Sequence, residues 1–232
     1  MSLTDQVIHL RDENGDEALS GWRAIHDRLL AIYGPQHWWP AETPFEVMVG
    51  AILTQNTAWT NVERALARLR ERVALDPAAI LTLAPDELAD ALRPAGYFNV
   101  KARRLTAFCQ SYLVAGGFAG LNALPTATLR RTLLAICGIG PETADDMLLY
   151  AFERPVFVID AYTRRIFARL GLLDGKADYE SIRAAFETAL DPDVSLFKEY
   201  HALLVRHSKE RCRTRPICAD CPLRQDCPGA VV

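Results

Sequence analysis

The sequence predicts an all-α protein, and two observations carry that prediction. Hydrophobic residues recur every three or four positions along most of the 232 residues, as at Trp22, Ile25 and Leu29. Glycine and proline residues divide the chain into about ten segments of helical length. Only residues 155–159 (PVFVI) have the pattern of an extended segment, which is too short to build a sheet.

Proline marks two helix starts. Thr43-Pro44 and Gly140-Pro141 each predict a helix N-terminus, because proline is favoured in the first turn of a helix. The polar segment 11–17 is expected to fray. No internal repeat is visible, which argues against a solenoid.

Composition indicates a soluble intracellular protein. Half of the residues are hydrophobic, enough for a sizeable core. No run of about 18 hydrophobic residues occurs, and residues 1–10 lack the basic start and apolar run of a signal peptide. We expect a cytoplasmic monomer that does not bind membranes.

Charge is unevenly distributed. The net charge of −3 argues weakly against nucleic-acid binding. Residues 198–215, however, hold six basic side chains against two acidic ones. Such a patch could supply phosphate contacts, or it could be a solvated helix face, and charge alone leaves both interpretations open.

Four of the six cysteines lie within the last 21 residues, with the spacing Cys-x5-Cys-x2-Cys-x5-Cys. These candidate metal ligands are Cys212, Cys218, Cys221 and Cys227. Paired zinc knuckles show two Cys-x2-Cys units, whereas this segment has one unit between two single cysteines. The spacing favours a 4Fe–4S cluster over zinc. Cys109 and Cys137 are expected to be ordinary buried thiols.

Residues 133–150 (LLAICGIGPETADDMLLY) predict a helical hairpin. One helix is expected to end at Cys137, residues 138–140 turn, and a new helix begins at Pro141. The first amides of that helix would form a site for one phosphate, with Gly138, Ile139, Gly140 and Thr143 as candidate DNA contacts. The alternative is a tight turn between helices without a ligand. Asp160, downstream, is a candidate helix N-cap, a candidate catalytic residue, or both.

The hairpin together with Asp160 resembles the endonuclease III superfamily of helix-hairpin-helix DNA glycosylases, over about residues 45–227. The resemblance implies a two-lobed fold. A six-helix barrel would span residues 36–154, and residues 1–35 and 155–232 would form an iron–sulfur cluster lobe, with the damaged base in a cleft between them. It also implies a nucleoid-associated enzyme of base excision repair that acts on double-stranded DNA. In this family the hairpin binds a DNA phosphate, with a monovalent cation on the hairpin carbonyls. The residue matching Asp160 is the catalytic carboxylate.

Glu142 departs from the bifunctional members of this family, which carry a Schiff-base lysine at the matching position. A carboxylate cannot form an imine. The resemblance therefore implies a monofunctional enzyme that hydrolyses the base–sugar bond with water, unless another lysine such as Lys101 acts instead.

An aromatic segment predicts the base pocket. Trp38, Trp39 and Pro40, with Trp59 and Glu142, are its candidate residues, although paired tryptophans also occur as core packing. Their pattern resembles the 3-methyladenine DNA glycosylase III branch, in which the residues matching Trp38 and Trp59 sandwich the base. That resemblance implies an alkylated purine, whose positive charge favours aromatic walls. Gln55 matches the family's wedge into the gap left by the flipped nucleotide; otherwise it is a solvent-facing residue at a helix end.

The C-terminal cysteines resemble the cluster motif of endonuclease III, with a first spacer one residue shorter. This resemblance implies a structural cluster that presents Arg213 and Arg215 to the DNA backbone. Two alternatives stay open: an endonuclease III-like glycosylase and lyase acting on oxidised pyrimidines, and a non-catalytic protein that binds lesions or abasic sites.

Overall fold

The computed structural model describes residues 21–231, and within them it contains twelve α-helices and no β-strand. The prediction of an all-α protein is confirmed. The segment 11–17, expected to fray, lies outside the described residues. None of the described helices has the length and apolar character that crossing a membrane requires.

The described chain divides into two compact units, one of residues 21–38 with 155–231 and the other of Trp39–Arg154. The sequence expectation places the first boundary at residue 36, slightly earlier. Each unit has its own core.

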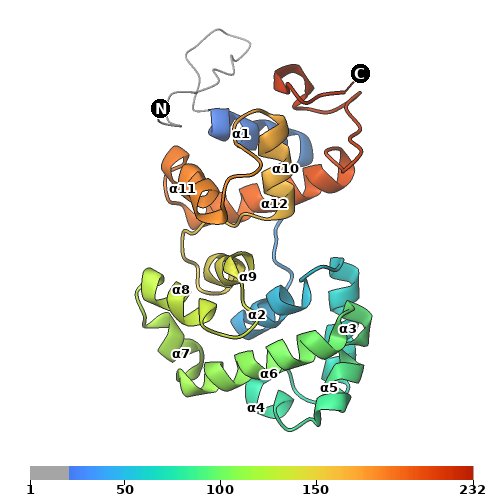
Figure 1. Ribbon diagram of the computed structural model, residues 1–232, viewed down its shortest axis with the longest axis vertical. Helices are drawn as coiled ribbons and strands as arrows, with labels where there is room; N and C mark the ends of the chain where they lie inside the picture. Colours follow the sequence, from blue (N-terminus) through green and yellow to red (C-terminus); the bar gives the residue numbers. More distant parts are fainter. Residues whose placement is uncertain (1–20, 232) are drawn as a thin grey trace. The chain divides into compact units, whose positions relative to one another are not determined.

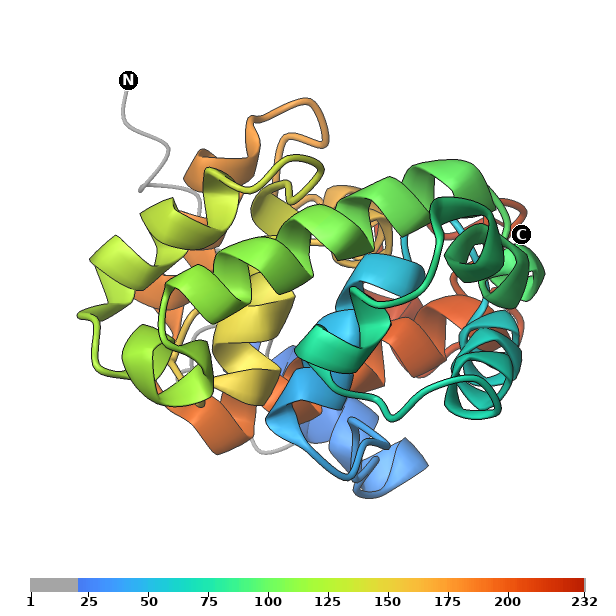
Figure 2. The same cartoon turned by 90° about the horizontal axis from the view of Figure 1, so that it is seen from below.

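The unit Trp39–Arg154 holds eight α-helices (Figure 1). They are α2 (Pro44–Leu53), α3 (Trp59–Arg70), α4 (Pro77–Ile80), α5 (Pro85–Ala91), α6 (Phe98–Val114), α7 (Gly117–Asn122), α8 (Thr126–Leu134) and α9 (Pro141–Asp146). The π-helix η3 (Met147–Ala151) continues α9. Both views show α6, in green, as a long helix, and it packs against α2, α4, α5 and α7 (Figure 1 and Figure 2).

Helix α2 lies at the centre of this unit, because all of its residues after Pro44 are buried. Its start is fixed by Thr43, whose side-chain oxygen accepts a hydrogen bond of 3.1 Å from the Glu46 amide. Glu46 is itself buried and pairs with Arg70 on α3 at 2.6 Å. The predicted helix start at Thr43-Pro44 is confirmed.

The other unit contains α1 (Gly21–Tyr33), α10 (Ala161–Arg169), α11 (Tyr179–Ala189), α12 (Val194–Glu210) and the short 3-10 helix η4 (Arg224–Asp226). Its core is an aromatic cluster. Phe186 stacks on Phe157 with ring centroids 4.1 Å apart, and Trp22 packs edge-on against Phe186 at 4.5 Å. Residues 153–160 form neither helix nor strand, and Phe157 anchors them in this core.

Candidate functional site

The hairpin between α8 and α9 differs at its first helix from the sequence prediction. Helix α8 ends at Leu134, not at Cys137, while α9 begins at Pro141 as predicted. The earlier end lets the following turn direct Ile136 and Ile139 into the core, where they are 7% and 5% exposed. The amide of Ile139 donates to the Ile136 carbonyl at 3.0 Å, so it serves the turn itself.

The two glycines of the hairpin are required for different reasons. Gly138 has φ +86°, and a Cβ there would lie 2.3 Å from the Cγ of Arg104 on α6. Gly140 has φ −91°, is exposed, and would meet no protein atom within 4 Å. The fold therefore requires glycine at 138, whereas glycine at 140 keeps the exposed face of the turn open to an approaching group.

The start of α9 has the chemistry of an anion site. Gly140 is its N-cap and supplies no side-chain hydrogen bond, and Pro141 follows at the first position. The amides of the first turn have no acceptor within the helix, and the helix dipole adds positive potential. Glu142 is exposed in this turn, while the Thr143 side chain is buried.

Gln55 supports the hairpin from within the same unit. Its Nε2 donates to the Gly138 carbonyl at 3.1 Å and to the Thr143 hydroxyl at 2.9 Å. Its Oε1 accepts a hydrogen bond from Arg104. The interpretation of Gln55 as a solvent-facing residue is therefore wrong, because both ends of its amide are bonded to protein. Its role as a wedge in DNA stays a prediction.

Three aromatic residues cluster beside α2. Trp39 packs edge-on against Trp59 with ring centroids 5.2 Å apart, and lies 5.1 Å from the ring of Tyr150. A Cβ on Gly50 would lie 3.2 Å from Trp59 and 3.3 Å from Trp39, so the glycine gives the two indoles their space. Pro40 is exposed beside them. Sequence reasoning missed Tyr150, which the π-helix η3 brings to this cluster.

Tyr97 has an unusual backbone conformation for an exposed aromatic residue. It is 70% exposed, and its backbone is left-handed with φ +45° just before α6. A bulky residue rarely adopts this conformation without a reason. The signal in the sequence is Gly96-Tyr97, a turn glycine followed by an aromatic residue between two helices.

Asp160 caps α10 in the other unit, where it is 9% exposed. Its Oδ1 accepts a hydrogen bond of 2.6 Å from the Thr163 amide, and its Oδ2 lies 3.6 Å from Nε2 of His201 on α12. Burial acts to raise the pKa of the carboxyl. His201 and Thr163 outweigh burial and hold the pKa of Asp160 below its ordinary value. Asp160 is thus a helix cap and a buried carboxylate at once.

Trp38 lies in the same unit as Asp160. Its indole stacks on the His201 ring with centroids 5.8 Å apart and planes within 4° of parallel. Lys209 Nζ lies 5.9 Å from the centroid of the Trp38 ring. The structure therefore places Trp38 beside the catalytic candidate, and Trp39 with Trp59 in the unit Trp39–Arg154.

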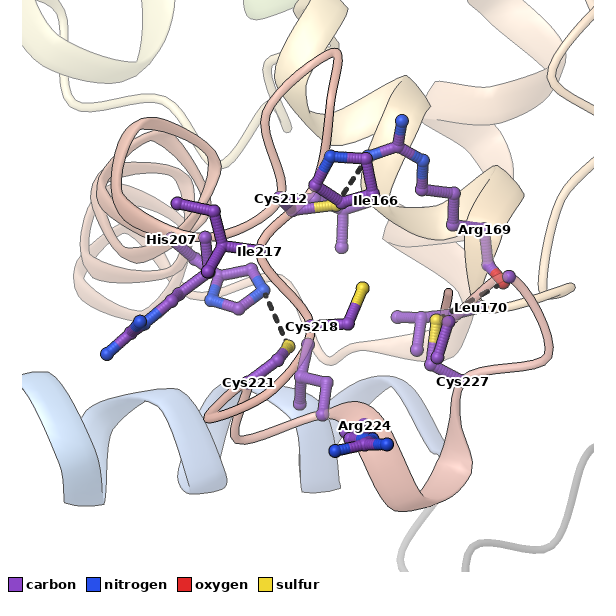
Figure 3. A pocket seen from close by; sticks show the side chains of 15 residues that line it. Ile166, Arg169, Leu170, His207, Cys212, Ile217, Cys218, Cys221, Arg224 and Cys227 are labelled. Carbon is purple, nitrogen blue, oxygen red and sulfur yellow. Dashed lines mark hydrogen bonds between the residues drawn. The ribbon is translucent and has the colours of Figure 1, made fainter. Parts of the chain in front are cut away.

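The four C-terminal cysteines line one hollow (Figure 3). Its apolar walls include Ile166, Leu170 and Leu223. Arg169 contacts two of the thiols: its guanidinium donates to the Cys212 sulfur at 3.3 Å, and its carbonyl accepts from the Cys227 thiol at 3.5 Å. Among the described residues, no three His, Cys, Asp or Glu side chains converge closely enough to hold one metal ion.

Burial dominates the electrostatics of this hollow. It raises the pKa of Cys221 and Cys227, and the neighbouring thiols raise both further. His207 lies 3.7 Å from the Cys221 sulfur, and burial lowers the pKa of its imidazole to about 4. The hollow thus favours uncharged side chains until a cation compensates the thiolates.

Two other predicted residues can now be placed. Cys109 is buried as predicted, and burial raises the pKa of its thiol to about 12. Cys137 is exposed, so the prediction that it is a buried thiol is wrong: it stands in the turn after α8, where Ile136 and Ile139 take the buried positions.

The cationic side chains fall into two classes. Lys101 is 1% exposed, its Nζ donates to the Ala95 carbonyl at 2.6 Å, and burial lowers its pKa to about 8. Arg213 and Arg215 are exposed next to the cysteine hollow. Lys101 is therefore buried with a structural partner, whereas the two arginines are exposed, and Arg213 Nε donates to the Lys209 carbonyl at 2.7 Å.

Comparisons with known proteins agree with this arrangement. A protein of Methanocaldococcus jannaschii, named as a DNA repair glycosylase, is 47% identical over 206 residues, which cover 88% of this chain and 94% of that protein. Endonuclease III of Sulfolobus acidocaldarius is 33% identical over 79% of this chain and 81% of its own length.

Solved structures show the same fold. The 3-methyladenine DNA glycosylase of H. pylori, bound to 1,N6-ethenoadenine, matches 82% of this chain and 97% of its own with a TM-score of 0.72 and 27% identity. An endonuclease III–DNA complex matches 89% of this chain and 94% of its own with a TM-score of 0.77 and 21% identity. Residues 49–192 match the family model of the HhH-GPD superfamily of base excision DNA repair proteins. The chain therefore belongs to this superfamily, as a helix-hairpin-helix DNA glycosylase.

Proposed function

We propose that this protein is a monofunctional glycosylase that releases alkylated purines from double-stranded DNA, acting as a monomer with water as the nucleophile. The observation that carries the proposal is the chemistry of two carboxylates, one in each unit. Asp160 is a buried carboxylate held ionised, and Glu142 is an exposed carboxylate at the position where resemblance places a Schiff-base lysine. Neither side chain can form an imine.

The reaction is a hydrolysis at the sugar carbon C1′. The bond from C1′ to the base nitrogen breaks, and its electron pair leaves with the base. A purine alkylated at N3 or N7 carries a positive charge before this step and departs neutral, so it needs little help from a general acid. Water then bonds to C1′ and gives up a proton. Asp160 stabilises the positive charge that develops on the sugar or accepts that proton.

The aromatic side chains support a purine as the substrate. Trp38 and the cluster of Trp39, Trp59 and Tyr150 offer flat surfaces on which an extruded base can stack. The H. pylori relative, named for 3-methyladenine and solved with an ethenoadenine, shares this fold at 27% identity. A cationic purine gains further from aromatic faces through cation–π attraction.

The hairpin supports binding to the DNA backbone. Gly140 is the N-cap of α9 and makes no side-chain hydrogen bond to the first turn. The start of this helix is therefore open to one phosphate group. Exposed Arg213 and Arg215 supply positive charge in the other unit. A monovalent cation on the hairpin carbonyls would add to the phosphate site.

The four cysteines suit a 4Fe–4S cluster. A single zinc ion binds each thiolate at about 2.3 Å, which draws four sulfurs close together. The thiols here line one hollow, and no three of the described ligand side chains converge closely enough for one metal ion, which favours a larger inorganic group. When bound, the cluster would hold the four thiols as thiolates and cross-link the C-terminal loop, a structural role.

The alternative with a specific observation behind it is a glycosylase with lyase activity on oxidised pyrimidines, because several relatives are named endonuclease III. Burial of Lys101 and its bond to Ala95 count against that lysine as the nucleophile.

A base-release assay tests the proposal. Duplexes containing 3-methyladenine, thymine glycol or a deaminated base are incubated with the enzyme, with and without alkali. We expect release of 3-methyladenine, with strand breaks only after alkali. Release of thymine glycol alone, or strand breaks without alkali, would overturn the proposal. Equal binding and equal inactivity of wild type and Asp160→Asn would instead indicate a non-catalytic lesion binder.

A further inference from the structure

Asp160 has two carboxylate oxygens, and they meet different partners. Oδ1 is held by the Thr163 amide at 2.6 Å, within the first turn of α10. This bond is a common helix N-cap, and it does not by itself indicate a catalytic role. Oδ2 lies 3.6 Å from Nε2 of His201, which comes from α12, a different element.

His201 is a buried polar residue on the long helix α12. Its side chain is 5% exposed, so the imidazole is removed from water next to a buried carboxylate. Beside a carboxylate oxygen, the imidazole tautomer with its proton on Nε2 is favoured, because this proton faces negative charge. The interaction with His201 is the largest influence that lowers the pKa of Asp160 against the opposing effect of burial.

The His201 ring is also fixed in orientation. Trp38 stacks on it with planes within 4° of parallel, and Lys209 Nζ lies near the Trp38 ring. A ring held by stacking keeps its Nε2 aimed at one point. Trp38, His201 and Asp160 therefore form one continuous contact within a single unit.

We propose that His201 is a positioning residue for the glycosylase reaction: backed by Trp38, it holds the second oxygen of Asp160 in place. The inference rests on the proposed role of Asp160 as the reacting carboxylate. His201 itself touches neither base nor sugar in this mechanism and moves no proton.

Two substitutions at one position separate this role from simple packing. His201→Leu fills the space without a polar hydrogen, and His201→Gln restores an N–H that can reach Asp160. Single-turnover base release on 3-methyladenine DNA is compared with the affinity for a duplex carrying a tetrahydrofuran abasic-site analogue. We expect His201→Leu to slow release at least about tenfold while affinity changes less than about threefold, and His201→Gln to recover most of the rate.

A release rate for His201→Leu within twofold of wild type would overturn the inference. So would equal losses in the Leu and Gln variants, or a loss of affinity that matches the loss of rate. If His201→Leu fails to fold, a His201→Asn variant decides through a second measurement, the pH titration of the Asp160 carboxyl followed by carbon NMR.

The NMR titration also distinguishes this inference from the proposed function. We expect the Asp160 carboxyl to titrate at lower pH in wild type than in a His201→Asn variant, whose shorter side chain withdraws the N–H. An unchanged titration overturns the positioning role even in an active enzyme. A wild-type protein that releases no base contradicts the proposed function, while the shifted titration still supports the contact between His201 and Asp160.

Discussion

Arg130 on α8 binds Asp145 on α9 through two hydrogen bonds, of 2.7 Å and 3.0 Å. The Asp145 side chain is 0% exposed and that of Arg130 15%, so the pair is largely removed from water. It joins the two helices on either side of the hairpin turn. The conformation of the turn therefore depends on a charge pair that lies outside it.

Removing one partner of this ion pair is expected to destabilise the fold. Arg130→Met leaves the Asp145 carboxylate buried and lowers the free energy of unfolding by about 3–5 kcal/mol. Urea denaturation measures the change. The control is Arg23→Ala, which removes an exposed pair with Asp27 and should change stability by less than about 1 kcal/mol. Similar losses in both variants would contradict the assignment.

The two hairpin glycines should respond differently to alanine. Gly138→Ala places a Cβ at φ +86° and against Arg104, so it should lower stability by about 1–3 kcal/mol. Gly140→Ala meets no protein atom and should leave stability within about 0.5 kcal/mol. If the turn binds a DNA phosphate, Gly140→Ala should weaken DNA binding even though the protein stays stable, because the added methyl group lies on the exposed face of the turn. Unchanged affinity for duplex DNA in a stable Gly140→Ala protein would argue against the phosphate site.

A lysine at position 142 should introduce Schiff-base chemistry. Glu142 is exposed, so Glu142→Lys is expected to fold. Its amine would stand where resemblance places the Schiff-base lysine, and borohydride trapping on lesion DNA should rise at least about tenfold over wild type. Glu142→Gln is the matched control and should trap no more than wild type. Strong trapping by the wild-type protein would contradict the monofunctional proposal.

The sequence predicts those features that depend on local spacing. Helical periodicity, the start of α9 at Pro141 and the gathering of four cysteines follow from patterns within a few residues. Features that depend on long-range packing cannot be predicted from local sequence patterns. Neither the contact of Asp160 with His201 nor the approach of Tyr150 to Trp39 through a π-helix has a local signature. Cys137 was expected inside as an ordinary buried thiol, and the earlier end of α8 exposes it.

The ionisation of Asp160 sets an expected pH dependence. Because the pKa of Asp160 is held below its ordinary value, the carboxylate persists down to about pH 4 and base release should show no acidic decline above it. The same shift stabilises the folded protein at pH values above the ordinary pKa of aspartate. This stabilisation is lost as the pH falls through the pKa of Asp160 in the folded state. Single-turnover rates at constant ionic strength measure the profile. A decline near pH 6 would contradict it.

Asp160→Asn should lower the rate about 10²- to 10⁴-fold at every pH.

Removing one cysteine of the hollow tests the cluster directly. If the proposed cluster is bound, the wild-type protein should be brown, with about four iron and four acid-labile sulfide per chain, and Cys218→Ser should lower both contents and bleach the colour. The loop after α12 would lose its cross-link. Hydrogen bonds and ion pairs still tie the loop to the helices, among them Arg28–Asp226, the bonds of Arg169 and the bond from Arg165 to the Cys212 carbonyl. The loss is therefore partial, and the thermal midpoint should fall by several degrees, on the order of 5 °C.

Cys137→Ser is the matched control, because Cys137 is exposed on the hairpin and does not line the hollow. It should retain full iron content, colour and stability. Zinc in place of iron in the wild-type protein would overturn the cluster assignment. Loss of iron in both variants would show that the four C-terminal cysteines are not the ligand set.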